Sequence, residues 1–173
     1  MPDPVSAELP QEQERLRAWL VEQGERFGYA TVEVEADRHG AGYVFSVGAW
    51  RNLGVPEGVV IGLPDGAGRT LLDGYLRRAK AGERFALGRP YQDFFDNAPV
   101  VFERVMRGHY PEFFGSALLV YPQGEFPAVQ LIVATPQGAW PWQADAPGGF
   151  ADWQPVLTQS GQPESWIPGV DGP

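Results

Sequence analysis

Phe126-Pro-Ala-Val-Gln-Leu-Ile-Val-Ala-Thr135 has the pattern of a buried central strand. An apolar run this short, rich in β-forming residues and bounded by turn residues, is typical of a strand covered on both faces. The turn Pro136-Gln-Gly138 follows, and Ala139-Trp-Pro-Trp142 then predicts an aromatic return strand. A single polar side chain, Gln130, interrupts the apolar run.

Further strands and helices are predicted from the spacing of apolar residues along the chain. Alternation or short apolar runs predict strands at residues 29–36, 43–48, 59–63 and 100–106. Helical spacing predicts long helices at residues 10–28 and 67–81, and short helices that begin at Pro111 and near Phe150. Residues 88–97 are expected to form a loop with three exposed aromatic side chains, Tyr91, Phe94 and Phe95.

This order of elements, with hairpin-sized turns between several strands, predicts an α+β fold. We expect a single domain in which a mixed, mostly antiparallel sheet is flanked by two main helices and a short third helix. Residues 1–9 are expected to form an N-terminal arm, residues 10–157 the domain, and residues 158–173 a C-terminal tail that lies on the surface or is mobile. The length of 173 residues fits one domain with a sizeable core.

The composition disfavours several kinds of partner and chemistry. The chain has 22 Asp and Glu against 13 Lys and Arg, and the resulting charge of −9 disfavours nucleic acids and anionic membranes. Cysteine is absent and histidine occurs twice, so we expect no disulfide, no metal site and no cofactor. No apolar run reaches the roughly 20 residues that span a bilayer, and no signal peptide is recognisable, so the expected location is cytoplasmic.

The candidate binding residues lie mainly on the central strand and its predicted return. A buried amide must find partners or lose roughly 1–3 kcal/mol, so Gln130 either holds a ligand or bridges main-chain groups. Trp140 and Trp142 share one side of the predicted return strand, and Pro141 between them indicates an edge. Two such side chains suit a ligand-lined cleft, a homodimer contact or ordinary core packing. The leading hypothesis is a non-catalytic module that binds a small molecule or a protein segment with Gln130, Trp140, Trp142 and Tyr110.

An enzyme is the alternative hypothesis. His109 lies between a predicted strand and a predicted helix, where loops often present functional side chains. It would act as a general acid or base, with Glu57 or Asp93 assisting. No P-loop and no Gly-x-Ser-x-Gly elbow supports this alternative. A flavin-binding sheet protein is a third hypothesis, since small barrels of this size can hold a flavin on aromatic strands, and a protein that stays colourless after incubation with flavin would contradict it.

Several short segments, in order along the chain, carry a resemblance to a known family. They include Tyr43-Val-Phe-Ser-Val-Gly48, Val60-Ile-Gly-Leu-Pro64, Phe126-Pro-Ala-Val-Gln-Leu131 and Gly138-Ala-Trp-Pro-Trp142. With them the chain resembles a bacterial family known as domain of unknown function 4262. The resemblance spans roughly residues 28–157, implies one domain, and marks Gln130 and the Trp-Pro-Trp turn as typical of the group. It implies no activity.

The chain departs from the family pattern in two places. It carries Val55-Pro56-Glu57 where relatives often carry His-Pro-Glu. It carries Thr135-Pro136-Gln137 where they often carry an aromatic residue, proline and aspartate. If that histidine and aspartate are catalytic in the relatives, this chain is impaired, which favours binding over catalysis.

Overall fold

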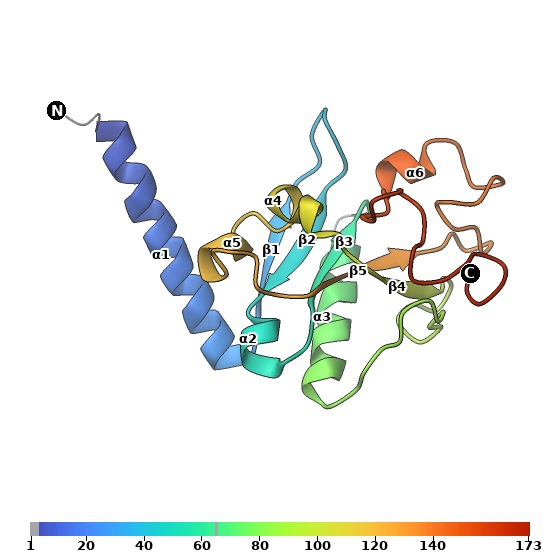
Figure 1. The fold of residues 1–173 in the computed structure, drawn as a ribbon, viewed down its shortest axis with the longest axis horizontal. Coiled ribbons are helices and arrows are strands. Elements are labelled where there is room, and N and C mark those ends of the chain that lie inside the picture. The colour runs from blue at the N-terminus through green and yellow to red at the C-terminus, as the bar shows by residue number, and fades with distance from the viewer. Residues whose placement is uncertain (1–3, 65) are drawn as a thin grey trace.

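Five strands form one mixed sheet in the computed structural model, which describes residues 4–64 and 66–173 (Figure 1). The strands are β1 (Ala30–Val34), β2 (Tyr43–Val47), β3 (Glu57–Ile61), β4 (Val100–Arg104) and β5 (Ala128–Val133). Their order in the sheet is β1-β2-β3-β5-β4. The β3–β5 pair is parallel and the other three pairs are antiparallel. The predicted α+β fold with a mixed, mostly antiparallel sheet is therefore confirmed.

The predicted central strand corresponds to β5, all six residues of which are buried. It lies between β3 and β4, so both of its edges already carry hydrogen-bonded neighbours. A tight turn follows, with the Thr135 carbonyl accepting from the Gly138 N–H and the Thr135 N–H donating to the Ala139 carbonyl. The return strand predicted at residues 139–142 is wrong, because no free edge of β5 remains for it to pair with.

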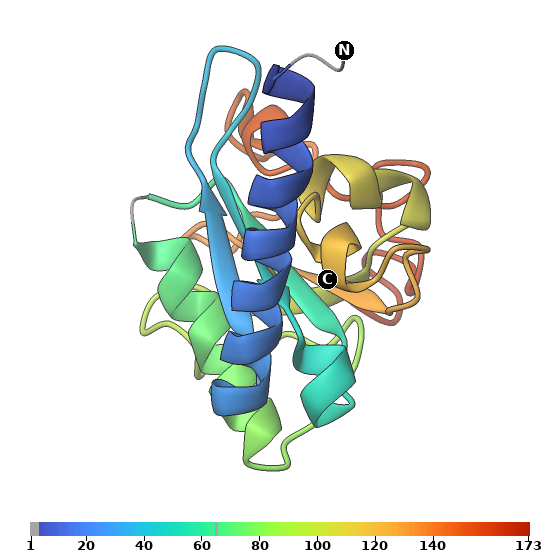
Figure 2. The same cartoon turned by 90° about the vertical axis from the view of Figure 1, so that its left-hand side faces the viewer.

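Helices cover both faces of the sheet (Figures 1 and 2). On one face α3 (Ala67–Lys80) buries the stripe expected from the sequence, which consists of Leu71, Leu72, Tyr75, Leu76 and Ala79. The other face is covered by α1 (Pro4–Phe27), α4 (Tyr110–Phe113) and α5 (Ala117–Val120), with the 3-10 turn η1 (Arg107–His109) preceding α4. No helix within the described ranges combines the length and the apolar character needed to cross a bilayer.

The boundaries of α1 differ from those predicted. The helix begins at Pro4 rather than Pro10, so residues 4–9 of the expected arm are helical, and residues 1–3 lie outside the described part. Figure 1 shows the first turns of α1 extending away from the sheet. Pro10 lies inside the helix.

One helix was not predicted at all. Residues 49–53 form α2 (Ala49–Leu53) where we expected a loop. Gly48, at its N-terminal boundary, has φ 101°, in the left-handed region that glycine occupies without strain. The helix is too short to show an apolar period, and the acceptor for its first N–H groups comes from β3, so local sequence could not indicate it.

The C-terminal residues are held on the sheet. The buried carboxylate of Glu103 on β4 accepts hydrogen bonds from the N–H groups of Glu164 (2.9 Å) and Ser165 (3.0 Å) and from the Ser165 hydroxyl. Trp166 is 5% exposed, and its Nε1 donates to the Pro173 carbonyl at 2.8 Å. The short helix α6 (Phe150–Trp153) precedes this segment. The expected surface tail is thus anchored by a buried carboxylate and a buried indole.

Candidate functional site

Gln130 is fully buried, and its amide is engaged by the main chain. Its Nε2 donates to the Pro155 carbonyl at 2.7 Å, and its Oε1 accepts from the Leu157 N–H at 2.9 Å. Gln154 makes the reciprocal pair of bonds from the later segment to the strand. Its Oε1 accepts from the Val133 N–H, and its Nε2 donates to the Val133 carbonyl. These two amides tie residues 154–157 to β5, which is the bridging role that the sequence left open for Gln130.

Trp140, Trp142 and Tyr110 also make intramolecular contacts. The rings of Trp140 and Trp142 stack with centroids 5.4 Å apart, and Trp166 meets Trp142 edge-on at 5.8 Å. Tyr110 stacks on Phe126 at 4.5 Å and donates its hydroxyl to the Phe126 carbonyl. Neither of the two hollows described below includes these side chains or Gln130.

The three candidates for catalysis are not brought together. The Nε2 of His109 lies 3.0 Å from the Thr158 carbonyl, Glu57 is buried beside α2, and Asp93 pairs with Arg78 at the surface. No hydrogen bond within the described residues joins any two of the three. In the same part of the chain, no three His, Asp or Glu side chains gather as metal ligands would.

Glu57 is the centre of a buried hydrogen-bond cluster. Its carboxylate accepts from the Ser46 hydroxyl (2.7 Å), the Tyr121 hydroxyl (2.8 Å) and the three N–H groups of residues 48–50 (3.0–3.2 Å). The two hydroxyls are themselves oriented, because Ser46 accepts from the Gly58 N–H and Tyr121 accepts from the Arg51 N–H. Glu57 therefore caps α2 from the neighbouring strand and links β2, β3 and α5.

Burial and hydrogen bonding shift the pKa of Glu57 in opposite directions. Burial raises the pKa of Glu57, and the hydrogen bonds from Ser46, Trp50, Tyr121 and Ala49 oppose that rise. Three of the five contacts are main-chain N–H groups, which can only donate, whereas the two hydroxyls can also accept. These fixed donors favour the ionised carboxylate over the protonated form, and the carboxyl oxygens are sealed from solvent.

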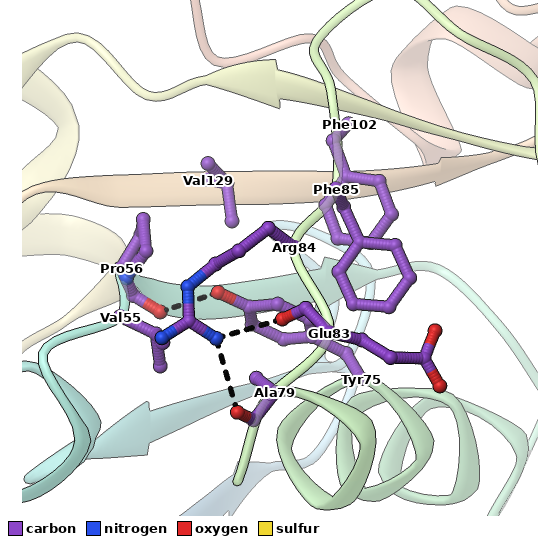
Figure 3. Close-up of a pocket in the computed structure, with 9 residues that line it drawn as sticks. All are labelled: Val55, Pro56, Tyr75, Ala79, Glu83, Arg84, Phe85, Phe102 and Val129. Atoms are coloured by element: carbon purple, nitrogen blue, oxygen red, sulfur yellow. Dashed lines mark hydrogen bonds between the residues drawn. The ribbon is translucent and has the colours of Figure 1, made fainter. Parts of the chain in front are cut away.

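A small apolar cavity lies on the other side of Pro56, where the residues just before β3 meet β4, β5 and α3 (Figure 3). Its volume is about 80 Å³. Its apolar and aromatic lining consists of Val55, Pro56, Tyr75, Phe85, Phe102 and Val129. Phe85 stacks on Phe102 at 4.9 Å, and Tyr75 meets both rings edge-on. Burial raises the pKa of Tyr75, whose hydroxyl donates to the Pro56 carbonyl at 2.8 Å.

Arg84 reaches across this cavity (Figure 3). Its Nη1 donates to the carbonyls of Ala79 (3.1 Å) and Glu83 (2.8 Å), which fixes the plane of the guanidinium group. Ala79 and Glu83 also line the cavity. The site thus combines an apolar interior with one positively charged group held in place by main-chain oxygens.

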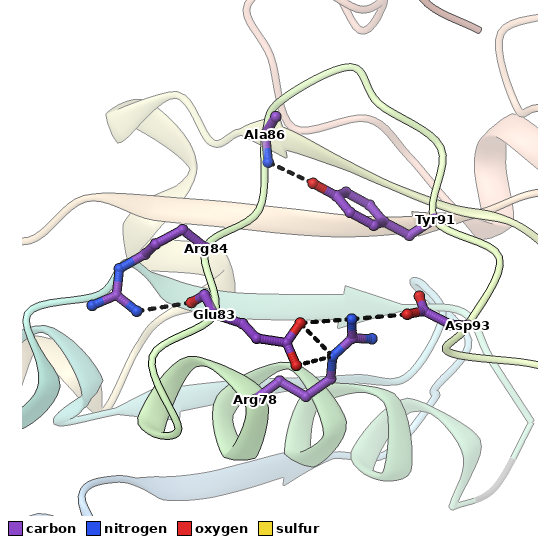
Figure 4. A network of polar contacts seen from close by, with 6 residues as sticks. All are labelled: Arg78, Glu83, Arg84, Ala86, Tyr91 and Asp93. Carbon is purple, nitrogen blue, oxygen red and sulfur yellow. Dashed lines mark hydrogen bonds and ion pairs between the residues drawn. The ribbon is translucent and has the colours of Figure 1, made fainter.

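The wall formed by Phe85 belongs to an aromatic segment, residues 83–98, which Arg78 holds against α3 (Figure 4). Arg78 pairs with Glu83 at 2.8 Å and with Asp93 at 2.9 Å, and this pairing holds the pKa of Asp93 below its ordinary value. The Arg78 guanidinium also lies over the rings of Phe85 (4.9 Å) and Phe94 (4.5 Å). The aromatic side chains expected to be exposed here are instead half-buried against the core.

Replacing Arg78 by alanine is expected to loosen the aromatic segment while changing global stability by about 1 kcal/mol or less, because both ion pairs are largely exposed. Faster hydrogen exchange is expected at the N–H groups of Gly88 and Tyr91, which bond the carbonyls of Phe102 and Val100. Arg77→Ala, at an exposed position on the same helix, serves as the control. Unchanged exchange at both amides would show that Arg78 does not hold the segment.

A second hollow, of about 630 Å³, lies between the β1–β2 hairpin and the start of α3. Its lining includes Glu33, Tyr43, Arg69 and Trp153. Its lining also includes Pro64 and Gly66, and residue 65 lies outside the described ranges. The smaller cavity is lined largely by apolar side chains from strands and a helix, and it is the better defined candidate site.

The comparison with known proteins identifies a family without a described activity. Residues 24–147 match a family model described as "Domain of unknown function (DUF4262)". No curated protein and no solved structure matches the chain. The matched range contains every residue that lines the cavity, and it ends before the segment that binds Gln130.

Proposed function

Because this chain belongs to the DUF4262 family, whose description names no activity, we propose a function from its geometry: it binds a small, largely apolar molecule in the cavity between β4, β5 and α3. The observation that carries the proposal is the cavity itself, lined by side chains of two strands, a helix and the aromatic segment. Native interiors are close-packed, with few voids larger than a water molecule. A hollow beside the buried Glu57 cluster therefore supports the proposal of a bound molecule.

The size of the cavity limits the ligand. An apolar cavity of about 150 Å³ holds one benzene molecule, so about 80 Å³ holds a branched aliphatic group or part of a ring. Sites for drug-sized ligands are several times larger, at roughly 300–1,000 Å³. The proposed ligand is therefore a small molecule whose apolar end enters the cavity.

A non-catalytic role is supported by the positions of the titratable groups. The oxygens of Glu57 are occupied by five internal donors, and the Asp93 carboxylate pairs with Arg78. The proposed site is aromatic, as expected from the sequence, but its aromatic residues are Tyr75, Phe85 and Phe102. The four residues expected from the sequence, Gln130, Trp140, Trp142 and Tyr110, are not part of it. The bacterial origin, the cytoplasmic location, a protein partner, a homodimer and the flavin hypothesis stay predictions from the sequence.

Blocking the cavity is expected to abolish binding of a neutral apolar probe. Isoamyl alcohol, titrated into the protein, is expected to shift the amide NMR signals of Tyr75, Phe85 and Val129, with a dissociation constant on the order of millimolar. Ala79→Leu places an isopropyl group in the cavity and is expected to weaken this binding by about tenfold or more.

The matched control is Ala81→Leu, which adds the same atoms at an exposed position just beyond α3. It is expected to bind the alcohol as the wild-type protein does. Equal binding by wild type and Ala79→Leu, with both proteins folded, would show that the alcohol occupies another place and would refute the proposal.

A further inference from the structure

We infer that the natural ligand of the cavity is a small ionised carboxylic acid, whose carboxylate is bound by the Nε and Nη2 edge of Arg84. This inference rests on the proposed function and adds the chemical class of the ligand. It follows from the hydrogen bonds of Arg84, from the charges around the cavity, and from the division of the site into an apolar interior and a cationic group.

Arg84 is oriented before any ligand arrives. Both hydrogens of its Nη1 are used, one on the Ala79 carbonyl and one on the Glu83 carbonyl. Its Nε and Nη2 have no hydrogen-bond partner among the described residues. A guanidinium presents these remaining donors in a fixed planar fork, which matches the two oxygens of a carboxylate. Because two carbonyls hold the group in place, little side-chain freedom is lost when a ligand binds.

The charge presented to a ligand is positive. The one carboxylate in the lining belongs to Glu83, and both of its oxygens accept from the Arg78 guanidinium. Glu57 lies next to Pro56, but its oxygens are occupied by the five donors of its own cluster. An ammonium ligand would meet the like charge of Arg84 and no unpaired carboxylate, so the site favours an anion.

The rest of the lining suits an apolar body. Tyr75 has already given its hydroxyl hydrogen to the Pro56 carbonyl, and Val55, Phe85, Phe102 and Val129 carry no polar atoms. One anionic head and a short branched or cyclic hydrocarbon body therefore match the two parts of the site. Val55 belongs to this apolar part, whereas the histidine expected at its position in relatives would place a polar ring there.

The test compares isovalerate with isoamyl alcohol, which has the same branched body and no charge, by NMR titration of the full chain. Isovalerate is expected to bind about tenfold or more tightly, and to shift the side-chain Nε–H signal of Arg84. Arg84→Gln is expected to remove this preference, so that isovalerate and the alcohol bind this variant with similar affinity. Arg107→Gln, which removes the same charge from an exposed arginine outside the cavity, is expected to retain the preference.

The outcomes separate the two proposals. Equal binding of acid and alcohol by the wild type, or an unchanged preference in Arg84→Gln, overturns the carboxylate inference and leaves the binding site in place. Failure of both compounds to bind overturns both proposals. If Arg84→Gln does not fold, Arg84→Lys is measured instead: it keeps the charge without the planar fork, so about a threefold or greater loss of isovalerate affinity is expected. Full affinity in that variant would refute the bidentate contact.

Discussion

Glu57→Gln is expected to lower the free energy of unfolding by about 3 kcal/mol, since each buried donor left without an acceptor costs about 1–3 kcal/mol. The glutamine has nearly the shape of the glutamate, so packing is preserved. Its NH2 group, however, must face donors at one of the two positions now occupied by a carboxylate oxygen. At either position it would lie against a main-chain N–H of α2, which cannot reorient.

The measurement is chemical denaturation of the wild type and the variant, with Tyr121→Phe as the graded comparison. Removing the tyrosine hydroxyl takes away one of the five donors to Glu57 and the acceptor of the Arg51 N–H, so a smaller loss of about 1–2 kcal/mol is expected. If Glu57→Gln were as stable as the wild type, the carboxyl would have to be protonated in the native state. That outcome would contradict an anion held by five donors.

Trp166→Ala is expected to cost about 3–4 kcal/mol, which is typical of removing a large buried aromatic side chain. The indole is 5% exposed and packs edge-on against Trp142. Gly88 fits closely against it, because a Cβ at that glycine would lie 3.1 Å from the Trp166 ring. The side chain therefore joins the C-terminal residues to the aromatic segment and to the Trp140–Trp142 stack.

The comparison for this variant is Trp153→Ala, because Trp153 is 50% exposed. That substitution is expected to cost less than about 1 kcal/mol. Limited proteolysis of Trp166→Ala is expected to cleave within residues 158–173 earlier than in the wild type. A loss of stability no larger than that of Trp153→Ala would mean that the C-terminal residues do not contribute to the folded core.

The sequence predicts an element well where burial leaves a pattern of apolar residues within a short window. The buried stripe of α3 has helical spacing, and β5 is a continuous apolar run, so each pattern is visible in a short window. It fails where a distant partner decides the structure. The α2 helix depends on a carboxylate from β3, and residues 139–142 cannot form a strand because β4 occupies the edge of β5.

In the candidate site, too, some features are visible in a short stretch of sequence and others depend on distant partners. Gln130 is conspicuous as a polar residue within an apolar run, but its acceptor and donor lie at residues 155 and 157, which no local pattern connects to it. Tyr75 and Phe102 have the pattern of ordinary core residues, and their role as cavity walls appears only when Phe85 is placed against them. The cluster of aromatic residues in the aromatic segment was the available signal, and it pointed to exposure rather than to a cavity.

The anchoring of residues 155–165 by Glu103 and Gln130 has a consequence for the order of folding. Both side chains sit on interior-facing positions of the sheet, yet their partners come from 25 to 62 residues further along the chain. We expect the sheet to assemble with the carboxylate and the amide still hydrated, and residues 155–165 to displace that water when they dock. Local unfolding is then expected to begin with detachment of residues 155–165, because water can at once hydrate the Glu103 carboxylate and the Gln130 amide that they uncover.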